Sequence, residues 1–215
     1  MITTNPTGFF ALPATGNGKA VLVLHAWWGL NSTMRVFCQR LADEGYSVFA
    51  PDLYAGKIAT TIAEAEVLVQ TLNTNDEPAR QQIQDAARSL SITRASGEPL
   101  AIIGFSLGAY FALDLAATSP ELVRSVTLFY GTGGGDLRSS RASFLGHFAG
   151  NDPYEPNEGV DALEDTLRNL GRTVTFHHYP EVGHWFCEPD RSDAYNPDAA
   201  DLAWQRTLDF LRLTF

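Results

Sequence analysis

The pentapeptide Gly104-Phe105-Ser106-Leu107-Gly108 constrains this chain more than any other stretch. It follows the apolar run Leu100–Ile103 and opens a segment with helix-like periodicity. A G-x-S-x-G sequence between a buried strand and a helix is typical of a nucleophile elbow, in which small flanking residues let strand and helix pass closely. The pattern predicts Ser106 as a nucleophile, with the backbone N–H of Leu107 facing a developing oxyanion.

A tight turn whose serine only caps the next helix fits the same five residues. Two downstream residues favour catalysis, because they complete the order serine, acid, histidine that this kind of fold uses. Asp152 follows the strand-like run Ala142–Leu145, and His184 follows the strand-like run Thr173–Phe176. Both are expected just past strand ends, where open parallel sheets place their chemistry.

The chemistry explains why three such residues are needed. A serine hydroxyl is a poor nucleophile, so His184 would take the proton of Ser106 as it attacks. A carboxylate on the other ring nitrogen would fix the tautomer and stabilise the imidazolium. Asp136 and Asp161 compete with Asp152 for that role, but Asp136 belongs to a glycine-rich loop and Asp161 to an amphipathic helix. Asp152 is therefore preferred.

Strand-like and helix-like segments alternate along the whole chain. The expected strands are Ala20–Leu24, Tyr46–Ala50, Leu100–Phe105, Ser125–Tyr130, Ser143–Phe148 and Thr173–Tyr179. The expected helices are Asn31–Ala42, Ile62–Leu72, Asp76–Leu90, Leu107–Ala117, Asn157–Leu170 and Asp198–Leu213. Such apolar strands belong to a parallel sheet covered on both faces. We expect one doubly wound, mostly parallel α/β domain over residues 1–215.

The composition of the chain indicates which kinds of partner it can bind. The chain has a net charge of −10 and no clusters of Lys and Arg, which binding to nucleic acid or to anionic membranes would require. Neither partner is therefore expected, whereas a small-molecule substrate is. The opening Met1–Pro6 has no export signal and no stretch is long enough to span a membrane, which indicates a cytoplasmic protein.

No metal site and no cofactor is expected. Neither Cys38 nor Cys187 has a second Cys or His at the spacing that a zinc site needs, so both are predicted to be ordinary thiols. Cys38 is expected on the buried face of a helix. His177 and His178 are adjacent on a strand, so they point to opposite faces. The segment Gly131–Arg138 is too short for a lid domain, and its glycines 133–135 indicate a flexible loop rather than a phosphate cradle.

Several motifs together resemble the dienelactone hydrolase family of the α/β-hydrolase fold. They are Leu24-His25-Ala26-Trp27-Trp28-Gly29-Leu30-Asn31, Ala50-Pro51-Asp52-Leu53-Tyr54, the Gly104–Gly108 elbow, Tyr179-Pro180 with Gly183-His184-Trp185-Phe186, and the stretch from Ala203 to Leu211. They span nearly the whole chain. The resemblance implies an α/β hydrolase without a lid, a triad, and an oxyanion hole formed by the N–H of Trp27 with that of Leu107.

Three departures from the family pattern stand out. The family type uses a cysteine nucleophile where this chain has Ser106, and a glutamate in the early loop where it has Ala26. An arginine that holds the substrate carboxylate in the family corresponds here to Glu188. The chain therefore resembles a serine esterase variant, and a carboxylated lactone is not the expected substrate.

Aromatic residues near the expected cleft suggest its walls. Trp28, Tyr54, Tyr110 and Trp185 are predicted to contact substrate, while packing alone also accounts for such side chains. His25 either orients the oxyanion loop or is satisfied by local backbone. We expect a serine hydrolase that cleaves a small ester, thioester or lactone through an acyl-enzyme. The alternative is a non-catalytic small-ligand binding protein on a hydrolase scaffold.

Overall fold

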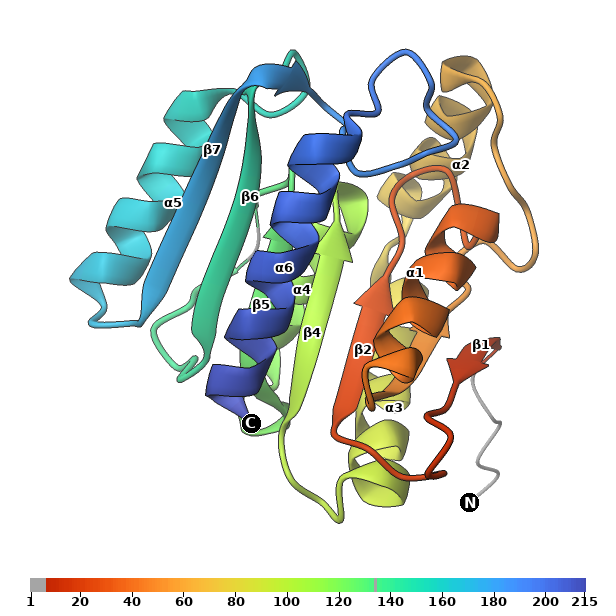
Figure 1. Ribbon diagram of the computed structural model, residues 1–215, viewed down its shortest axis with the longest axis vertical. Coiled ribbons are helices and arrows are strands. Elements are labelled where there is room, and N and C mark those ends of the chain that lie inside the picture. Colours follow the sequence, from red (N-terminus) through yellow and green to blue (C-terminus); the bar gives the residue numbers. More distant parts are fainter. Residues whose placement is uncertain (1–6, 134) are drawn as a thin grey trace.

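A twisted seven-stranded sheet forms the centre of the computed structural model (Figure 1). The structure describes residues 7–133 and 135–215. Two expectations lie outside these ranges: the absence of an export signal in the segment 1–6, and Gly134 of the flexible loop. The strands are β1 (Gly8–Ala11), β2 (Ala20–Leu24), β3 (Ser47–Pro51), β4 (Leu100–Phe105), β5 (Val123–Phe129), β6 (Ser143–Asn151) and β7 (Val174–Gly183). Their order is β1-β3-β2-β4-β5-β6-β7; β1 runs antiparallel to β3 and the remaining neighbours are parallel.

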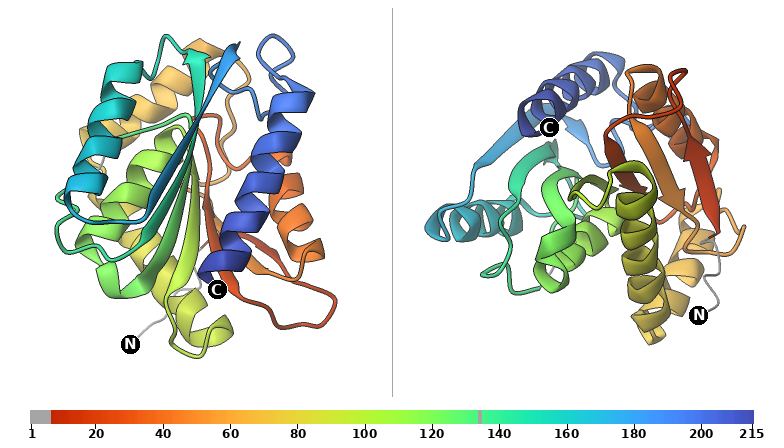
Figure 2. Two further views of the ribbon diagram at one scale, coloured as in Figure 1. Left: turned by 60° about the vertical axis from the view of Figure 1, so that its left-hand side comes forward. Right: turned by 90° about the horizontal axis from the view of Figure 1, so that it is seen from below.

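Helices cover both faces of this sheet (Figure 2). They are α1 (Ser32–Asp43), α2 (Ile62–Thr74), α3 (Glu77–Arg94), α4 (Leu107–Thr118), α5 (Asn157–Asn169) and α6 (Pro197–Thr214), with a 3-10 turn at Pro120–Leu122. Buried residues of α1 and α6 form one core cluster, and those of α3, α4 and α5 form the other. This is the doubly wound α/β arrangement that the sequence predicts.

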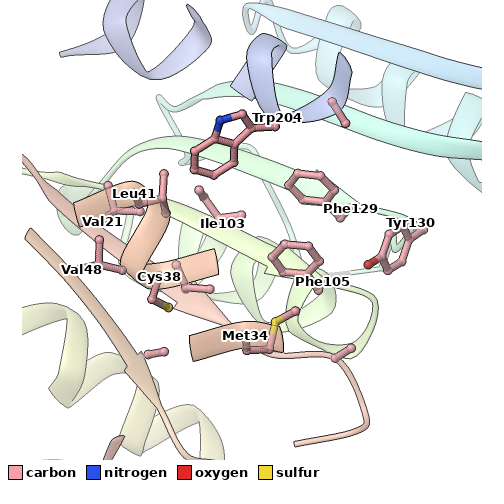
Figure 3. Packing of buried hydrophobic residues seen from close by; sticks show 14 of the residues in the cluster. Val21, Met34, Cys38, Leu41, Val48, Ile103, Phe105, Phe129, Tyr130 and Trp204 are labelled. Atoms are coloured by element: carbon pink, nitrogen blue, oxygen red, sulfur yellow. The ribbon is translucent and has the colours of Figure 1, made fainter. Parts of the chain in front are cut away.

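The strands supply both cores because successive side chains point to opposite faces. On β2, Val21 and Val23 join the cluster under α1 and α6, whereas Leu22 and Leu24 join the opposite one. Figure 3 shows the first cluster, where side chains from both helices meet strand residues. Cys38 lies there on the buried face of α1, as predicted, and burial raises its pKa to about 12.

All six expected helices and all six expected strands are present, with ends that shift by a few residues. Strand β1 was not expected. It has four residues, lies at the sheet edge and is partly exposed, so it has little of the apolar pattern that marks a central strand. Strand β7 continues through Pro180 to Gly183; an edge strand tolerates a proline because one side of it has no ladder partner.

The chain changes its direction of travel across the sheet between β2 and β4. From β2 it first adds β3 on one side, and from β4 to β7 it adds strands on the other. Ligands bind outside the carboxyl ends of parallel strands at such a switch point. In the described residues no lid domain covers this edge, and no helix there is long and apolar enough to cross a membrane.

Candidate active site

Ser106, Asp152 and His184 are each the first residue after a strand. They follow β4, β6 and β7, so all three lie at the carboxyl edge of the sheet. Strands β6 and β7 pair Asn151 with Gly183, which brings the next residues, Asp152 and His184, side by side. The register of the sheet therefore assembles residues that are 32 and 78 positions apart in the chain.

The turn at Ser106 has the geometry of a nucleophile elbow. Its φ is 49° and its ψ is −111°, a conformation that side-chain-bearing residues rarely adopt. A Cβ on Gly104 would lie 2.4 Å from the carbonyl oxygen of Gly108, and one on Gly108 would lie 2.2 Å from that of Leu24. Only glycine permits this closeness, which is the reason the motif needs both.

A continuous series of hydrogen bonds joins the three side chains. Ser106 Oγ lies 2.9 Å from His184 Nε2, and His184 Nδ1 lies 2.7 Å from Asp152 Oδ2. An ionised carboxylate only accepts, so Nδ1 carries the proton and Nε2 is left to accept from the serine hydroxyl. The side chains of His184 and Asp152 are 4% and 2% exposed, so water competes little for these bonds.

The second oxygen of Asp152 is also engaged. Oδ1 accepts from the backbone N–H groups of Tyr154 and Glu155, at 2.9 and 3.0 Å. This carboxylate is therefore held in one orientation, with Oδ2 toward the imidazole. The two alternative acids lie elsewhere: Asp136 pairs with Arg138, which lowers its pKa to about 2, and Asp161 is exposed on α5.

Two backbone N–H groups are the predicted donors to the oxyanion, and both belong to residues that line the pocket at Ser106. That of Leu107 opens α4, where the first helical N–H groups have no acceptor within the helix. That of Trp27 lies in the loop after β2, and the described residues offer it no backbone acceptor. Close packing of Gly108 against the carbonyl oxygens of Leu24 and His25 brings this loop to the elbow.

His25 holds the peptide that carries the Trp27 N–H. Its Nε2 accepts from the N–H of Leu53 at 3.2 Å, so Nδ1 bears the proton and donates to the carbonyl oxygen of Ala26 at 2.6 Å. Burial lowers the pKa of His25, in keeping with this neutral form. In a trans peptide the C=O of Ala26 and the N–H of Trp27 point in opposite directions, so fixing one fixes the other.

A pocket of about 200 Å³ opens beside Ser106, and we call it the reaction pocket. Its lining residues are Trp27, Val69, Ser106, Leu107, Tyr154 and His184. Sequence reasoning missed Val69 and Tyr154 as lining residues. Tyr154 follows Asp152 by two residues, and the backbone bonds to Asp152 fold it back toward the site, a turn that the Asp-Pro sequence hints at. Val69 comes from α2, and nothing local marks it.

The four aromatic residues predicted to contact substrate do not line the reaction pocket. Trp185 lies behind it, stacked on Trp27 at 5.6 Å between ring centroids. Trp28 is buried under the guanidinium of Arg191, and Tyr54 packs against His25. Tyr110 turns toward α3, where its hydroxyl accepts from Arg80. Trp28, Tyr54 and Tyr110 are thus used for packing, whereas Trp185 supports the pocket wall and also lines a neighbouring hollow at His184.

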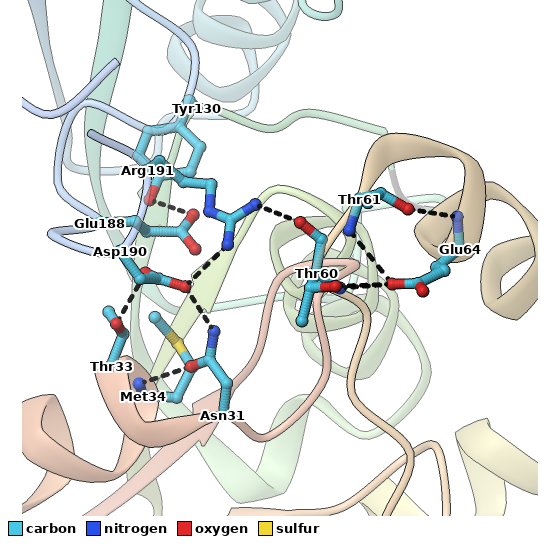
Figure 4. Close-up of polar contacts among 10 residues, drawn as sticks. All are labelled: Asn31, Thr33, Met34, Thr60, Thr61, Glu64, Tyr130, Glu188, Asp190 and Arg191. Carbon is cyan, nitrogen blue, oxygen red and sulfur yellow. Dashed lines mark hydrogen bonds and ion pairs between the residues drawn. The ribbon is translucent and has the colours of Figure 1, made fainter. Parts of the chain in front are cut away.

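A buried polar group lies next to the histidine. The Tyr130 ring is 5.0 Å from the His184 ring, and its hydroxyl donates to Glu188 Oε1 at 2.8 Å. The Glu188 side chain is fully buried, and burial raises its pKa to about 8. Figure 4 shows this pair beside a second network, in which Asp190 accepts from Asn31 and Thr33 and from Arg191.

The mostly parallel sheet, the serine elbow at its switch point and the linked histidine and aspartate define an α/β-hydrolase fold. Within that class the chain belongs to the dienelactone hydrolase family, whose model matches residues 7–215. The expected fold and family are thereby confirmed, and membership makes the protein a hydrolase.

The relatives extend over nearly the whole chain. A "Putative carboxymethylenebutenolidase" from Yersinia pestis is 30% identical and covers 97% of this chain and 86% of its own length. One of the same name from Aquifex aeolicus is 29% identical, with 95% and 92% covered. The crystal structure of a "Putative Dienelactone Hydrolase" from Klebsiella pneumoniae is 26% identical, with a TM-score of 0.79, and 94% of this chain and 90% of that chain are covered.

Proposed function

We propose that this protein is a serine hydrolase that cleaves a small ester, thioester or lactone through an acyl-enzyme. The observation that carries the proposal is the unbroken hydrogen-bond series from Ser106 through His184 to Asp152, which opens on the reaction pocket. Family membership supports hydrolysis in general. Ser106, His184 and Asp152, with the hydrogen bonds between them, support the serine chemistry.

In the proposed mechanism Ser106 Oγ attacks the substrate carbonyl while His184 Nε2 takes its proton. The N–H groups of Leu107 and Trp27 stabilise the oxyanion, and Asp152 stabilises the imidazolium. His184 then gives the proton to the leaving alcohol or thiol as its bond to the acyl carbon breaks, which leaves an ester on Ser106; the alcohol or thiol departs, whereas the hydroxyl of an opened lactone stays attached to the acyl group. Water, deprotonated by His184, repeats the attack on this ester and releases the carboxylic acid, restoring the serine.

Labelling with an alkyl fluorophosphonate tests the nucleophile. Attack by an activated serine forms a P–O bond and expels fluoride, so intact mass should show one adduct on the parent protein. The Ser106→Ala variant should show none, while Ser192→Ala, which removes an exposed loop serine, should label like the parent. Ester turnover should fall about a thousandfold or more in Ser106→Ala and in His184→Ala, with unchanged melting.

An unlabelled parent, or full turnover by folded Ser106→Ala, would contradict this mechanism. An adduct on the parent that persists in Ser106→Ala would place the reactive serine elsewhere.

A further inference from the structure

In the part of the chain that the structure describes, two hollows reach His184, and no lysine or arginine is among their lining residues. The first is the reaction pocket. The second, here the side hollow, has a volume of about 300 Å³ and shares Tyr154 and His184 with it. The side hollow is lined by Asn151, Pro153, Tyr154, Glu181, Val182, Gly183, His184, Trp185, Asp193, Ala194, Tyr195 and Asn196. A substrate seated at Ser106 has these two spaces for its groups.

Apart from the reacting groups, the walls of the reaction pocket are mostly apolar and, among the described residues, have no charged side chain. Trp27 and Tyr154 meet edge to face, at 5.5 Å between ring centroids, and Val69 and the Leu107 side chain complete the lining. A carboxylate that enters such a pocket loses its hydration, and no cation in the lining compensates for that loss. In the side hollow it would meet the carboxylates of Glu181 and Asp193.

The arginines of neighbouring segments are committed to other partners. Arg191 donates to Asp190 and to the carbonyl oxygen of Thr60, and its guanidinium lies 4.1 Å from the centroid of the Trp28 ring. Arg80 pairs with Asp76 at the N-cap of α3 and with Asp114 on α4. Moving either side chain to the pocket would break these interactions.

We propose that the reaction pocket accepts neutral acyl donors with a short apolar acyl group and rejects acyl groups that carry a carboxylate. This rests on the hydrolysis proposed above, because it names the substrate class of that site. The same property favours release of the product. Cleavage of the acyl-enzyme with water yields a carboxylate and a proton, and the described pocket lining has no cation to bind the new anion. Release of the acid is therefore expected to be fast and product inhibition weak.

A pair of matched esters tests the proposal. The p-nitrophenyl ester of hexanoic acid and the mono-p-nitrophenyl ester of adipic acid share a leaving group and chain length and differ in one terminal carboxylate. We expect kcat/KM to favour the hexanoate by about 100-fold or more at pH 7.5. The ratio should persist in 0.5 M NaCl, since desolvation in a pocket is not screened as the long-range field of a protein with net charge −10 is.

Two lysine variants on α2 locate the effect. Val69→Lys places a cation in the reaction pocket and should lower the ester ratio about tenfold or more. Val67→Lys is the matched control, because Val67 is on the same helix, 63% exposed, and outside the pocket lining. It should leave the ratio unchanged, and melting curves verify that both variants fold.

A parent ratio within threefold, or a preference for the adipate, would overturn the proposed selectivity while leaving the serine mechanism intact. A ratio that disappears in high salt, or that shifts equally in both lysine variants, would assign it to the net charge of the protein instead of the pocket. Failure of the parent to cleave either ester, together with no fluorophosphonate adduct, would contradict the serine mechanism itself.

Discussion

Three residues around the histidine adopt positive φ values without being glycine. They are Ser106 at 49°, Tyr130 at 37° and Trp185 at 64°. Each such conformation costs about 1–3 kcal/mol and persists only where the surroundings determine it. Tyr130 and Trp185 are both buried, and each ring lies 5.0 Å from the His184 ring. The strained backbone thus places two aromatic side chains against the imidazole and restricts its orientation.

The sequence alone predicts the candidate triad residues well and the residues of the pocket walls poorly. The elbow is a local motif, and Asp152 and His184 were recognised because each follows a strand. Their hydrogen bonds are now observed, while their catalytic roles stay a prediction. Val69 and Tyr154 were missed as wall residues, because which side chain borders a pocket depends on how helices and loops pack around the strand ends.

His25 is expected to act as a positioning residue for the proposed oxyanion hole. The His25→Gln variant loses the geometry that holds the Ala26–Trp27 peptide, so one donor to the oxyanion is misplaced. A lost oxyanion donor lowers kcat by about 100-fold to 1,000-fold, and a displaced one should cost up to that amount. Steady-state kinetics should show the loss in kcat with KM nearly unchanged, and weaker binding of a trifluoromethyl ketone.

His147→Gln is the matched control for this experiment. His147 is also a fully buried histidine, but its ring contacts the hydroxyls of Tyr179 and Thr207, away from the serine and its oxyanion loop. Both variants should lose stability, and only His25→Gln should lose affinity for the ketone. Equal effects on kcat in the two variants would reduce His25 to an ordinary core residue.

Among the elements, α2 is the wall of the site that is held least firmly. Of its residues only Ala65 is fully buried, whereas α4 buries seven. Its start is instead fixed by polar contacts, which Figure 4 shows. Thr61 and Glu64 form a capping box, and Arg191 donates to the carbonyl oxygen of Thr60. A helix that carries Val69 yet packs this lightly is expected to open more readily than the rest of the fold.

Thr61→Ala should loosen α2 without damaging the rest of the fold. An N-cap threonine contributes about 1 kcal/mol to its helix. Because α2 buries so little, we expect the loss to appear as faster amide hydrogen exchange within Ile62–Thr74, with little change in global melting. KM for an ester should rise a few-fold as the Val69 wall moves, while kcat stays near the parent value.

The cap of α6 provides the comparison. Asn196 accepts from the N–H of Ala199, and α6 buries five residues, including Trp204. Asn196→Ala should therefore lower the global melting temperature and leave exchange in α2 unchanged. If Thr61→Ala lowered global stability as much as Asn196→Ala does, α2 would be coupled to the core more tightly than its burial indicates.

The elements themselves were largely predictable. Helices with apolar residues at three- and four-residue steps and strands rich in Val, Ile and Leu carry their own signal. Strand β1 does not, since its four residues, Gly8–Ala11, are too few to show a period and include no polar residue that would reveal an alternation. The inclusion of Pro180 in β7 depends on that strand lying at the sheet edge, a property of the strand order that no local pattern contains.

In the whole molecule, the order of the strands brings together site residues that no local sequence pattern connects. The reversal between β2 and β4 places the loop that carries Trp27 beside the elbow, and the remaining strands bring Asp152 and His184 to the same edge. The same packing encloses Glu188, a carboxyl in a protein that already carries a net charge of −10. The pH dependence of global stability should therefore include the titration of this buried carboxyl.

Glu188 is expected to make the folded state less stable as pH rises. Burial raises its pKa to about 8, against 4.5 for the free side chain. Between these values the unfolded chain has released a proton that the folded chain keeps, so stability falls by up to about 1.4 kcal/mol per pH unit. Below pH 4.5 both states hold the proton, and the stabilisation is complete; above pH 8 it is lost.

Glu188→Gln isolates this contribution, because the amide oxygen can still accept from the Tyr130 hydroxyl but no proton titrates. Urea unfolding of parent and variant at pH 5 and pH 9 should show the variant gaining stability relative to the parent at the higher pH. The buried histidines His25 and His147, whose pKa values burial lowers, destabilise both proteins alike in acid and cancel in the difference. A difference independent of pH would mean that Glu188 is ionised in the folded protein, with a cation or water reaching its second oxygen, which has no partner in the described residues.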